Sequence, residues 1–152
     1  MSPPEHSPES DRSGCVLVVD DNDDLRHMWC LALQSAGFDV IAAGTQVKLQ
    51  RRLVEAQPHA LLINLQRSEA DGLALLSRMR ARQALREVPI VFLSGIDDDD
   101  FQGRALSAGA DWVGVRPLRV VELQSRVSEL VRHGRPVPQE GRPCIVQLKR
   151  TG

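Results

Sequence analysis

The chain has 152 residues, with 19 basic against 20 acidic side chains and a formal net charge of −1. That length suits a single domain, and the even balance excludes a protein whose main role is non-specific nucleic-acid binding, which needs a basic excess. No apolar run approaches the roughly 20 residues of a membrane helix, and the N-terminus lacks a signal-peptide pattern. Cys15, Cys30 and Cys144 fit neither a C-x-x-C motif nor a metal site, so we expect reduced thiols in a cytoplasmic protein.

The two ends of the chain differ in composition from its middle. Residues 1–13 are rich in Pro, Ser and charge, and such a segment cannot bury enough apolar surface to offset the entropy of ordering. From residue 134 onward Gly and Pro recur, interrupted by a short apolar stretch over 144–148 that suits either one strand or an adhesive tail. We therefore expect flexible tails over 1–13 and 134–152 and one domain over 14–133.

Short apolar runs alternate with amphipathic stretches across this domain. The runs are rich in Val, Ile and Leu, which is typical of strands buried on both faces, and they cover residues 15–19, 38–42, 61–65, 88–93 and 112–115. Five strand–helix units with short links predict an α/β fold, a (βα)5 doubly wound five-stranded parallel sheet with helices on both faces.

Amphipathic spacing places the five helices. The first is predicted to end at Gly37 and to bury Leu25, Met28, Trp29, Ala32 and Ala36. The second is predicted to begin from Thr45 as N-cap and to bury Val47, Leu49, Leu53, Val54 and Ala56. The third starts near Asp71, the fourth lies between the run of Asp at 97–100 and Gly109, and the fifth contains Leu123, Val127, Leu130 and Val131.

Polar residues stand at the ends of the apolar runs. In an open parallel sheet, ligands bind beyond the carboxyl ends of the strands, so the last residue of each strand is a candidate site residue. These positions are Asp20, Asp21, Asn64, Ser94 and Arg116. We expect them to form one pocket.

The same positions lie in motifs that resemble the receiver domain of bacterial two-component response regulators, the CheY-like family. The motifs are the segments 16–21, 64–72, 88–95, 108–111 and 115–118, in order and at the family's spacing. The resemblance implies a flavodoxin-like sheet with strand order 2-1-3-4-5. It also implies a pocket in which the aspartate ending the third strand accepts a phosphoryl group, an acidic pair holds Mg²⁺, and a Ser/Thr and a Lys bind the phosphoryl oxygens.

Several positions depart from that pattern. Asn64 stands at the phosphoacceptor position and Arg116 at the lysine position, while Arg67-Ser68 replaces a Met-Pro pair. Val113 stands at the aromatic switch position, with Trp112 beside it. These departures favour a degenerate pseudo-receiver.

The exchange at Asn64 changes the chemistry of the pocket. An amide oxygen is neutral and a poor nucleophile, so we expect no acyl phosphate, no catalytic residue and no enzymatic activity. Three carboxylates and a lysine sum to −2, whereas Asp20, Asp21, Asn64 and Arg116 sum to −1. One unit charge at about 4 Å and an effective dielectric near 20 is worth about 4 kcal/mol, so Mg²⁺ binding should be weak or absent. At most a residual metal site at Asp20 and Asp21 remains, and Arg116 is predicted to bridge one of these carboxylates.

Structural roles compete with these assignments. Asp20 and Asp21 could instead cap the N-terminus of the first helix. Ser94 could be a turn residue, and Arg116 could be a solvent-exposed charge in a loop. His6, His27, His59 and His133 show no metal-ligand spacing.

The function that these residues predict is that of a stand-alone pseudo-receiver acting by phosphorylation-independent protein–protein interaction. Its partner would be a sensor kinase, a regulator or a homodimer mate, with no nucleic-acid or membrane role. The docking face that the resemblance implies is Phe101, Arg104, Leu106, Trp112, Val113, Val115 and Arg119, with an exposed Trp112 as a hot spot.

The alternative is a receiver still phosphorylated in a phosphorelay, at another carboxylate or after deamidation of Asn64. A flavin- or nucleotide-binding protein is disfavoured because the acidic run 20–24 replaces a glycine-rich loop.

Overall fold

The computed structural model describes residues 14–64 and 69–136. One parallel sheet contains β1 (Cys15–Asp20), β2 (Asp39–Ala43), β3 (Ala60–Asn64), β4 (Ile90–Ser94) and β5 (Trp112–Val115), in the order β2-β1-β3-β4-β5. The strands alternate with α1 (Asp23–Ser35), α2 (Gln46–Glu55), α3 (Glu69–Ala81), α4 (Asp99–Ala108) and α5 (Val120–His133), and a 3₁₀ turn (Gln83–Leu85) precedes β4. The predicted fold class and strand order are confirmed.

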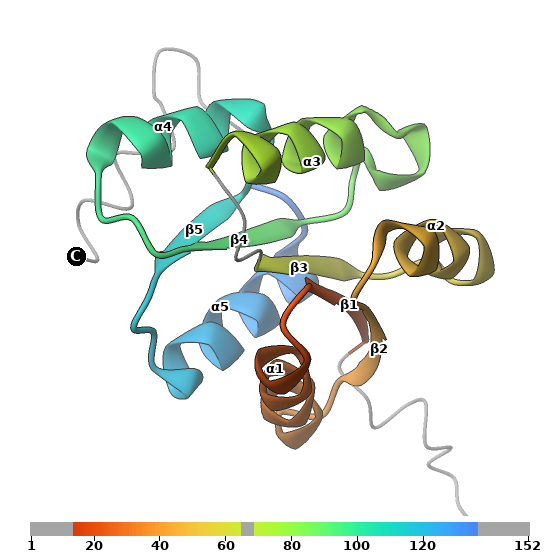
Figure 1. Ribbon diagram of the computed structural model, residues 1–152. Coiled ribbons are helices and arrows are strands. Elements are labelled where there is room, and N and C mark those ends of the chain that lie inside the picture. Colours follow the sequence, from red (N-terminus) through yellow and green to blue (C-terminus); the bar gives the residue numbers. More distant parts are fainter. Residues whose placement is uncertain (1–13, 65–68, 137–152) are drawn as a thin grey trace, which may run out of the picture.

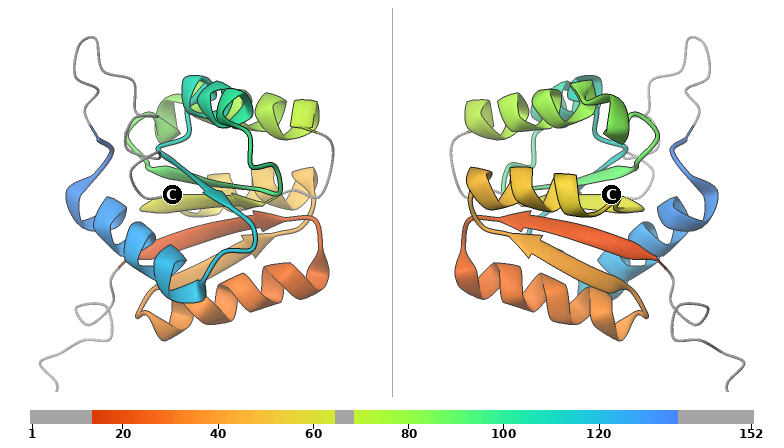
Figure 2. Two further views of the ribbon diagram at one scale, coloured as in Figure 1. Left: turned by 90° about the vertical axis from the view of Figure 1, so that its left-hand side faces the viewer. Right: turned by 90° about the vertical axis from the view of Figure 1, so that its right-hand side faces the viewer.

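The sheet is covered on both faces (Figures 1 and 2): α1 and α5 pack on one side, and α2, α3 and α4 on the other. Alternate side chains of each strand point into one of two apolar layers. Leu17 and Ile63 belong to the layer under α2, α3 and α4. Val16 and Leu62 belong to the layer under α1 and α5, which also holds Trp29. The carboxyl ends of the strands therefore rest on a core that is closed on both sides.

Three predicted helix ends, each assigned from a capping residue or a glycine, are confirmed. Thr45 Oγ1 accepts a hydrogen bond from the Lys48 amide and caps α2. Gly37, with φ of 98°, follows the end of α1, and Gly109, with φ of 126°, follows the end of α4. The α3 helix begins at Glu69, two residues before the predicted start at Asp71.

Some predictions about helix faces were wrong. Asn22, not Asp20 or Asp21, caps α1, because its Oδ1 accepts from the Leu25 amide. Met28, Val47 and Val54 are exposed, although the periodicity assigned them to the core. The α2 helix buries only a narrow stripe around Leu49, so apolar residues beside that stripe face solvent. The predicted tail over 1–13, the segment 144–148 and the pair Arg67-Ser68 lie outside the described residues. Of the tail predicted over 134–152, only residues 134–136 are described, and there Arg135 forms an ion pair with Asp111.

An ion-pair cluster fastens the amino-terminal edge of the sheet. Asp111 accepts from Arg80 at 2.8 Å and from Arg135 at 2.9 Å, and the Ile90 amide donates to the same carboxylate at 2.8 Å. Arg80 also donates to the carbonyls of Gly109 and Val88. These contacts of Asp111 and Arg80, which we call the clamp, connect α3, the start of β4 and the end of α5. They lie at the edge of the sheet opposite the polar strand ends.

Replacing Gly109 by Ala tests the clamp. A Cβ at this position would lie 2.7 Å from Cβ and Cγ of Arg80, at a backbone angle that L-residues rarely adopt. Gly134→Ala is a matched control, since its φ is 77° but nothing lies within 4 Å of its added Cβ. We expect the control to lose about 1 kcal/mol of unfolding free energy and Gly109→Ala to lose about 1–3 kcal/mol more, measured by urea denaturation. Equal losses would contradict a packing role for Arg80.

Candidate functional site

Strand register brings the first two polar residues of the pocket together. Asp20 is the last residue of β1 and Asn64 the last of β3, and the two are paired Cα partners in adjacent parallel strands. Both side chains are completely buried. Their meeting follows from the apolar runs that precede them, because each run ends at the same edge of the sheet.

The side chains of Asp20, Asn64 and Arg116 form one hydrogen-bonded chain. Asn64 Nδ2 donates to Asp20 Oδ2 at 2.7 Å, and Arg116 Nη1 donates to Asn64 Oδ1 at 2.9 Å. The amide serves both neighbours because it carries a donor for the carboxylate and an acceptor for the guanidinium. A carboxylate at position 64 would offer no proton to Asp20.

The prediction that Arg116 bridges Asp20 or Asp21 directly was wrong. Within the described part of the chain Arg116 forms no ion pair with either carboxylate, and it reaches Asp20 only through the Asn64 amide. Its guanidinium lies against Gly95, where an added Cβ would be 2.8 Å from Arg116 Nη2. The arginine therefore occupies space that any side chain at position 95 would take.

Asp20 is held by groups that the sequence did not single out. The Asn22 amide donates to Asp20 Oδ1 at 2.9 Å, and Arg26 Nη1 donates to the Asp20 carbonyl at 2.9 Å. Arg26 also pairs with Asp23. Burial raises the pKa of Asp20 and the nearby Asp21 adds to this, whereas hydrogen bonds from Asn22 and Asn64 and the charge of Arg26 act against it. The sequence signal for Arg26 was its place on the first turns of α1, one turn beyond the acidic pair.

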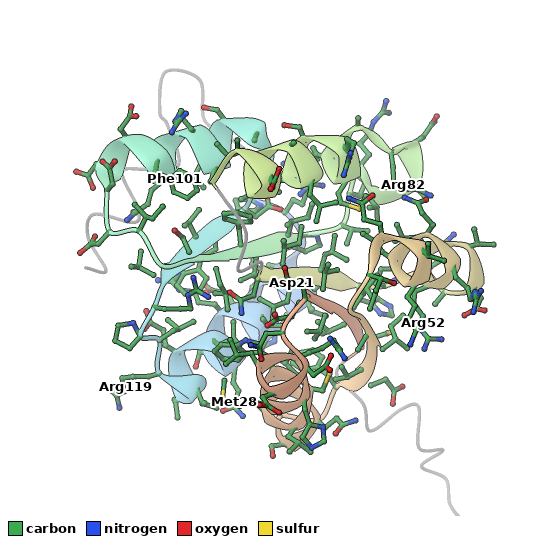
Figure 3. The ribbon with its side chains drawn as sticks, viewed as in Figure 1. Asp21, Met28, Arg52, Arg82, Phe101 and Arg119 are labelled. Carbon is green, nitrogen blue, oxygen red and sulfur yellow. The ribbon has the colours of Figure 1, made fainter. Side chains whose placement is uncertain are left out.

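Ser94 and Asp21 lie at the margins of the pocket. Ser94 is buried at the end of β4, and its Oγ accepts from the Ile96 amide at 2.9 Å, so it shapes the turn that follows the strand. Asp21 is half-buried and lines a cavity of about 140 Å³ between α2 and α3, together with Leu49, Asp71 and Arg78. Figure 3 shows Asp21 near the centre of this edge of the molecule, beside the end of β1.

The donor set of the pocket does not suit a hard divalent cation. Among residues 14–64 and 69–136, no group of three or more His, Cys, Asp or Glu side chains is arranged to hold a metal ion. Asn64 Nδ2 presents a proton to Asp20 Oδ2, where Mg²⁺ would need a free anionic oxygen. A cation would have to displace this hydrogen bond before it could use the Asp20 carboxylate.

The predicted docking face is only partly on the surface. Phe101, Trp112 and Val113 are 2%, 7% and 3% exposed, so the expectation of an exposed Trp112 was wrong. Because side chains alternate along β5, Trp112 points into the layer with Trp29, where Arg126 stacks 5.4 Å from its ring, and Val113 points into the opposite layer. Arg104 and Arg119 are exposed, and Leu106 and Val115 are half-buried. Figure 3 shows Phe101 below α4 and Arg119 at the lower corner beside α5.

Comparison with known proteins agrees with this architecture. The family model of the response regulator receiver domain matches residues 16–128. The chain is 32% identical to the transcriptional regulatory protein AruR of Pseudomonas aeruginosa over 142 residues, covering 90% of the chain and 57% of that protein. It is 32% identical to the transcriptional regulatory protein PrrA of Mycobacterium leprae over 117 residues, covering 77% of the chain and 49% of that protein. The chain thus spans about half the length of these curated relatives.

Solved structures show the same fold. The signal receiver domain of a signal transduction histidine kinase from Syntrophus aciditrophicus superposes with a TM-score of 0.69 at 25% identity, covering 78% of this chain and 90% of that one. Chemotaxis response regulator CheY4 of Vibrio cholerae superposes with a TM-score of 0.68 at 21% identity, covering 76% of this chain and 97% of that one. The chain belongs to the response regulator receiver domain family. No helix in the described ranges is long and apolar enough to cross a membrane.

The pH dependence of stability tests the environment of Asp20. A raised pKa means that the folded state binds more protons than the unfolded state between the two pKa values, so the destabilising contribution of Asp20 is present at neutral pH and is lost as the pH falls. Asp20→Asn removes this titration. The unfolding free energy of the variant minus that of the wild type should therefore decrease from pH 7 towards pH 4, measured by urea denaturation.

The same substitution at Asp24, which is exposed on α1, reports the behaviour of a carboxylate outside the pocket. A difference between Asp20→Asn and the wild type that stays constant across this pH range, or grows as the pH falls, would contradict the burial argument.

Proposed function

We propose that this receiver domain is a pseudo-receiver, which binds a partner protein without being phosphorylated. The observation that carries the proposal is the state of the Asn64 amide at the carboxyl end of β3. Its oxygen accepts from Arg116 and its nitrogen donates to Asp20, so both ends of the side chain are engaged. A phosphoacceptor needs a charged oxygen with a free lone pair, and this side chain offers neither.

Three further features support a pocket that does not switch between two states. The Asn64 amide satisfies Asp20 without a cation, which removes the reason for binding Mg²⁺ there. Ser94 Oγ is used by the Ile96 amide in its own turn, so it has a structural partner in the absence of a phosphoryl group. Val113, at the position of the family's aromatic switch, is a buried β-branched residue with no long side chain to exchange between an inner and an outer position.

We place the partner on the exposed part of the face formed by α4, β5 and α5. Arg104, Leu106, Val115 and Arg119 remain accessible there, whereas Phe101, Trp112 and Val113 support the face from inside. Exposed arginines beside partly buried aliphatic residues are typical of interaction surfaces. The partner that suits the family is another signalling protein, such as a kinase or a regulator.

Chemical phosphorylation tests the missing nucleophile. Incubation of the chain with acetyl phosphate and Mg²⁺ should leave its intact mass unchanged, because the phosphoacceptor position holds a neutral amide and not a carboxylate. Asn64→Asp, which restores a carboxylate at the same position, is the matched control and should gain about 80 Da in a fraction of molecules.

The alternative of a receiver phosphorylated elsewhere predicts a different outcome. A gain of about 80 Da in the wild-type chain, located by peptide mapping to an acidic residue other than 64, would contradict the proposal. A gain found only in molecules whose residue 64 has already been hydrolysed to Asp would instead identify deamidation as the activating step.

With a carboxylate restored at position 64, the stability of the domain should depend on bound Mg²⁺. In Asn64→Asp, two carboxylates would face each other where the amide now donates at 2.7 Å, so we expect a loss of about 2 kcal/mol at pH 7 without Mg²⁺. Millimolar Mg²⁺ should recover most of this loss, and Asn64→Asp with Arg116→Lys should bind Mg²⁺ more tightly. Asn64→Ala, which removes the amide without adding charge, should show no Mg²⁺ response in thermal denaturation. If Asn64→Asp is equally unresponsive, charge is not what limits metal binding.

A further inference from the structure

The net charge of −1 hides two oppositely charged ends of the molecule. Four consecutive aspartates, Asp97–Asp100, precede and open α4, and all four are exposed. We call them the acidic α4 edge. Basic side chains gather instead along α2 and the end of α3, at Lys48, Arg51, Arg78 and Arg82. We call these four residues, with Val47 and Val54, the basic α2–α3 surface.

Among residues 14–64 and 69–136, no ion pair joins the cations of the basic α2–α3 surface to a carboxylate. Lys48, Arg51 and Arg78 are exposed. Arg82, the residue directly after α3, donates to Gln50 Oε1 at 2.9 Å, a contact that joins the chain at the end of α3 to α2. Arg52 is excluded from the set because it pairs with Glu55. The surface therefore extends over α2 and the end of α3 and carries a net positive charge, with Asp21 and Asp71 beside Arg78 in the cavity lining at its margin.

Two exposed valines favour a protein as the occupant. Val47 and Val54 are 69% and 82% exposed and flank Arg51 at i, i+4 and i+7, which places all three on the outer face of α2. A phosphate backbone contacts cations but offers nothing against which an aliphatic side chain could be buried. A protein surface that carries carboxylates can contact both the valines and the arginines.

The two charged regions lie at opposite ends of the domain. In Figure 1 the β4–α4 connection enters α4 at the left, and α2 and the end of α3 lie at the right. Figure 3 places Arg52 and Arg82, which mark the basic end, on the right-hand edge. Since one molecule cannot bring its own ends together, the charges of the acidic α4 edge can meet the basic α2–α3 surface only in a second copy.

We propose that this chain associates head-to-tail with a second copy of itself, the acidic α4 edge of one copy docking on the basic α2–α3 surface of the next. The contact joins two different surfaces, so it is heterologous and can continue into short chains. Exposed ion pairs are individually weak and are screened by salt, so the association is expected only at high protein concentration and low ionic strength. It does not depend on the state of Asn64 or on the proposed pseudo-receiver function.

Sedimentation velocity of the wild-type chain is the first test. At about 0.02 M salt the weight-average sedimentation coefficient should rise with protein concentration, and at about 0.3 M salt it should stay at the monomer value, because the screening length shortens several-fold. A monomer at every concentration in low salt, or a dimer that salt does not weaken, would overturn the proposal.

Complementary charge reversal is the second test. Arg51→Glu with Arg78→Glu takes the basic surface from +4 to 0, and Asp97→Lys with Asp99→Lys takes the acidic edge from −4 to 0 while keeping Asp98 as the N-cap of α4. Each double variant alone should associate at least about tenfold more weakly than the wild type. An equimolar mixture should recover a dimer, because the unchanged acidic edge of the first variant can dock on the unchanged basic surface of the second. Circular dichroism checks that each variant is folded.

The control separates this contact from a general charge effect. Arg132→Glu with Gln34→Glu and Ser35→Glu changes the net charge by −4, as much as the Arg51 and Arg78 variant does. These exposed positions on α5 and α1 lie outside both surfaces and outside the proposed partner face, so this variant should associate like the wild type. Loss of association in this control, or failure of the mixture to assemble, overturns the proposal. Binding of a fluorescein-labelled DNA duplex by the basic α2–α3 surface without any self-association would assign that surface to nucleic acid instead.

Discussion

The hydrogen bond from Asn64 Nδ2 to Asp20 Oδ2, 2.7 Å long, is the contact on which the properties of the pocket depend. It joins two completely buried side chains that strand pairing holds side by side. A buried carboxylate must be compensated, and in this pocket an amide proton, the Asn22 amide and the positive charge of Arg26 do so. Since no metal ion is needed for this balance, the pocket can be complete without metal, and its chemistry differs from that of a site built around a third carboxylate.

The fold and the site are connected through the ends of the strands. The apolar runs bury β3 fully and β1 from Val16 onward, and the polar residue that ends each run lies at the same edge of the sheet. Arg116 reaches that edge from the end of β5, past Gly95, which leaves room for its guanidinium. The ion-pair cluster around Asp111 lies at the other edge, so the groups that stabilise the fold are kept apart from those that define the pocket.

Much of this arrangement was predictable from the chain. Alternating apolar runs and amphipathic stretches indicated the sheet, and the meeting of Asp20 with Asn64 followed from strand ends. The partner of Arg116 was not predictable, because a long side chain near two carboxylates and an amide can reach any of them. The apolar run over 112–115 favoured burial of Trp112 in either layer, and the expectation of an exposed Trp112 came instead from the docking face that the family resemblance implies. Val47 and Val54 are exposed because apolar character alone does not establish that a helix position is buried.

Nuclear magnetic resonance of the Asn64 side-chain amide, titrated with Mg²⁺, tests the central claim most directly. If this amide takes the place of a cation beside Asp20, its two proton resonances should keep their hydrogen-bonded shifts as Mg²⁺ rises to about 20 mM, a concentration at which intact receiver pockets with hard oxygen ligands would be occupied. A saturable movement of these resonances with Mg²⁺, together with loss of the hydrogen-bonded shift, would show that the cation displaces the amide and would contradict the account.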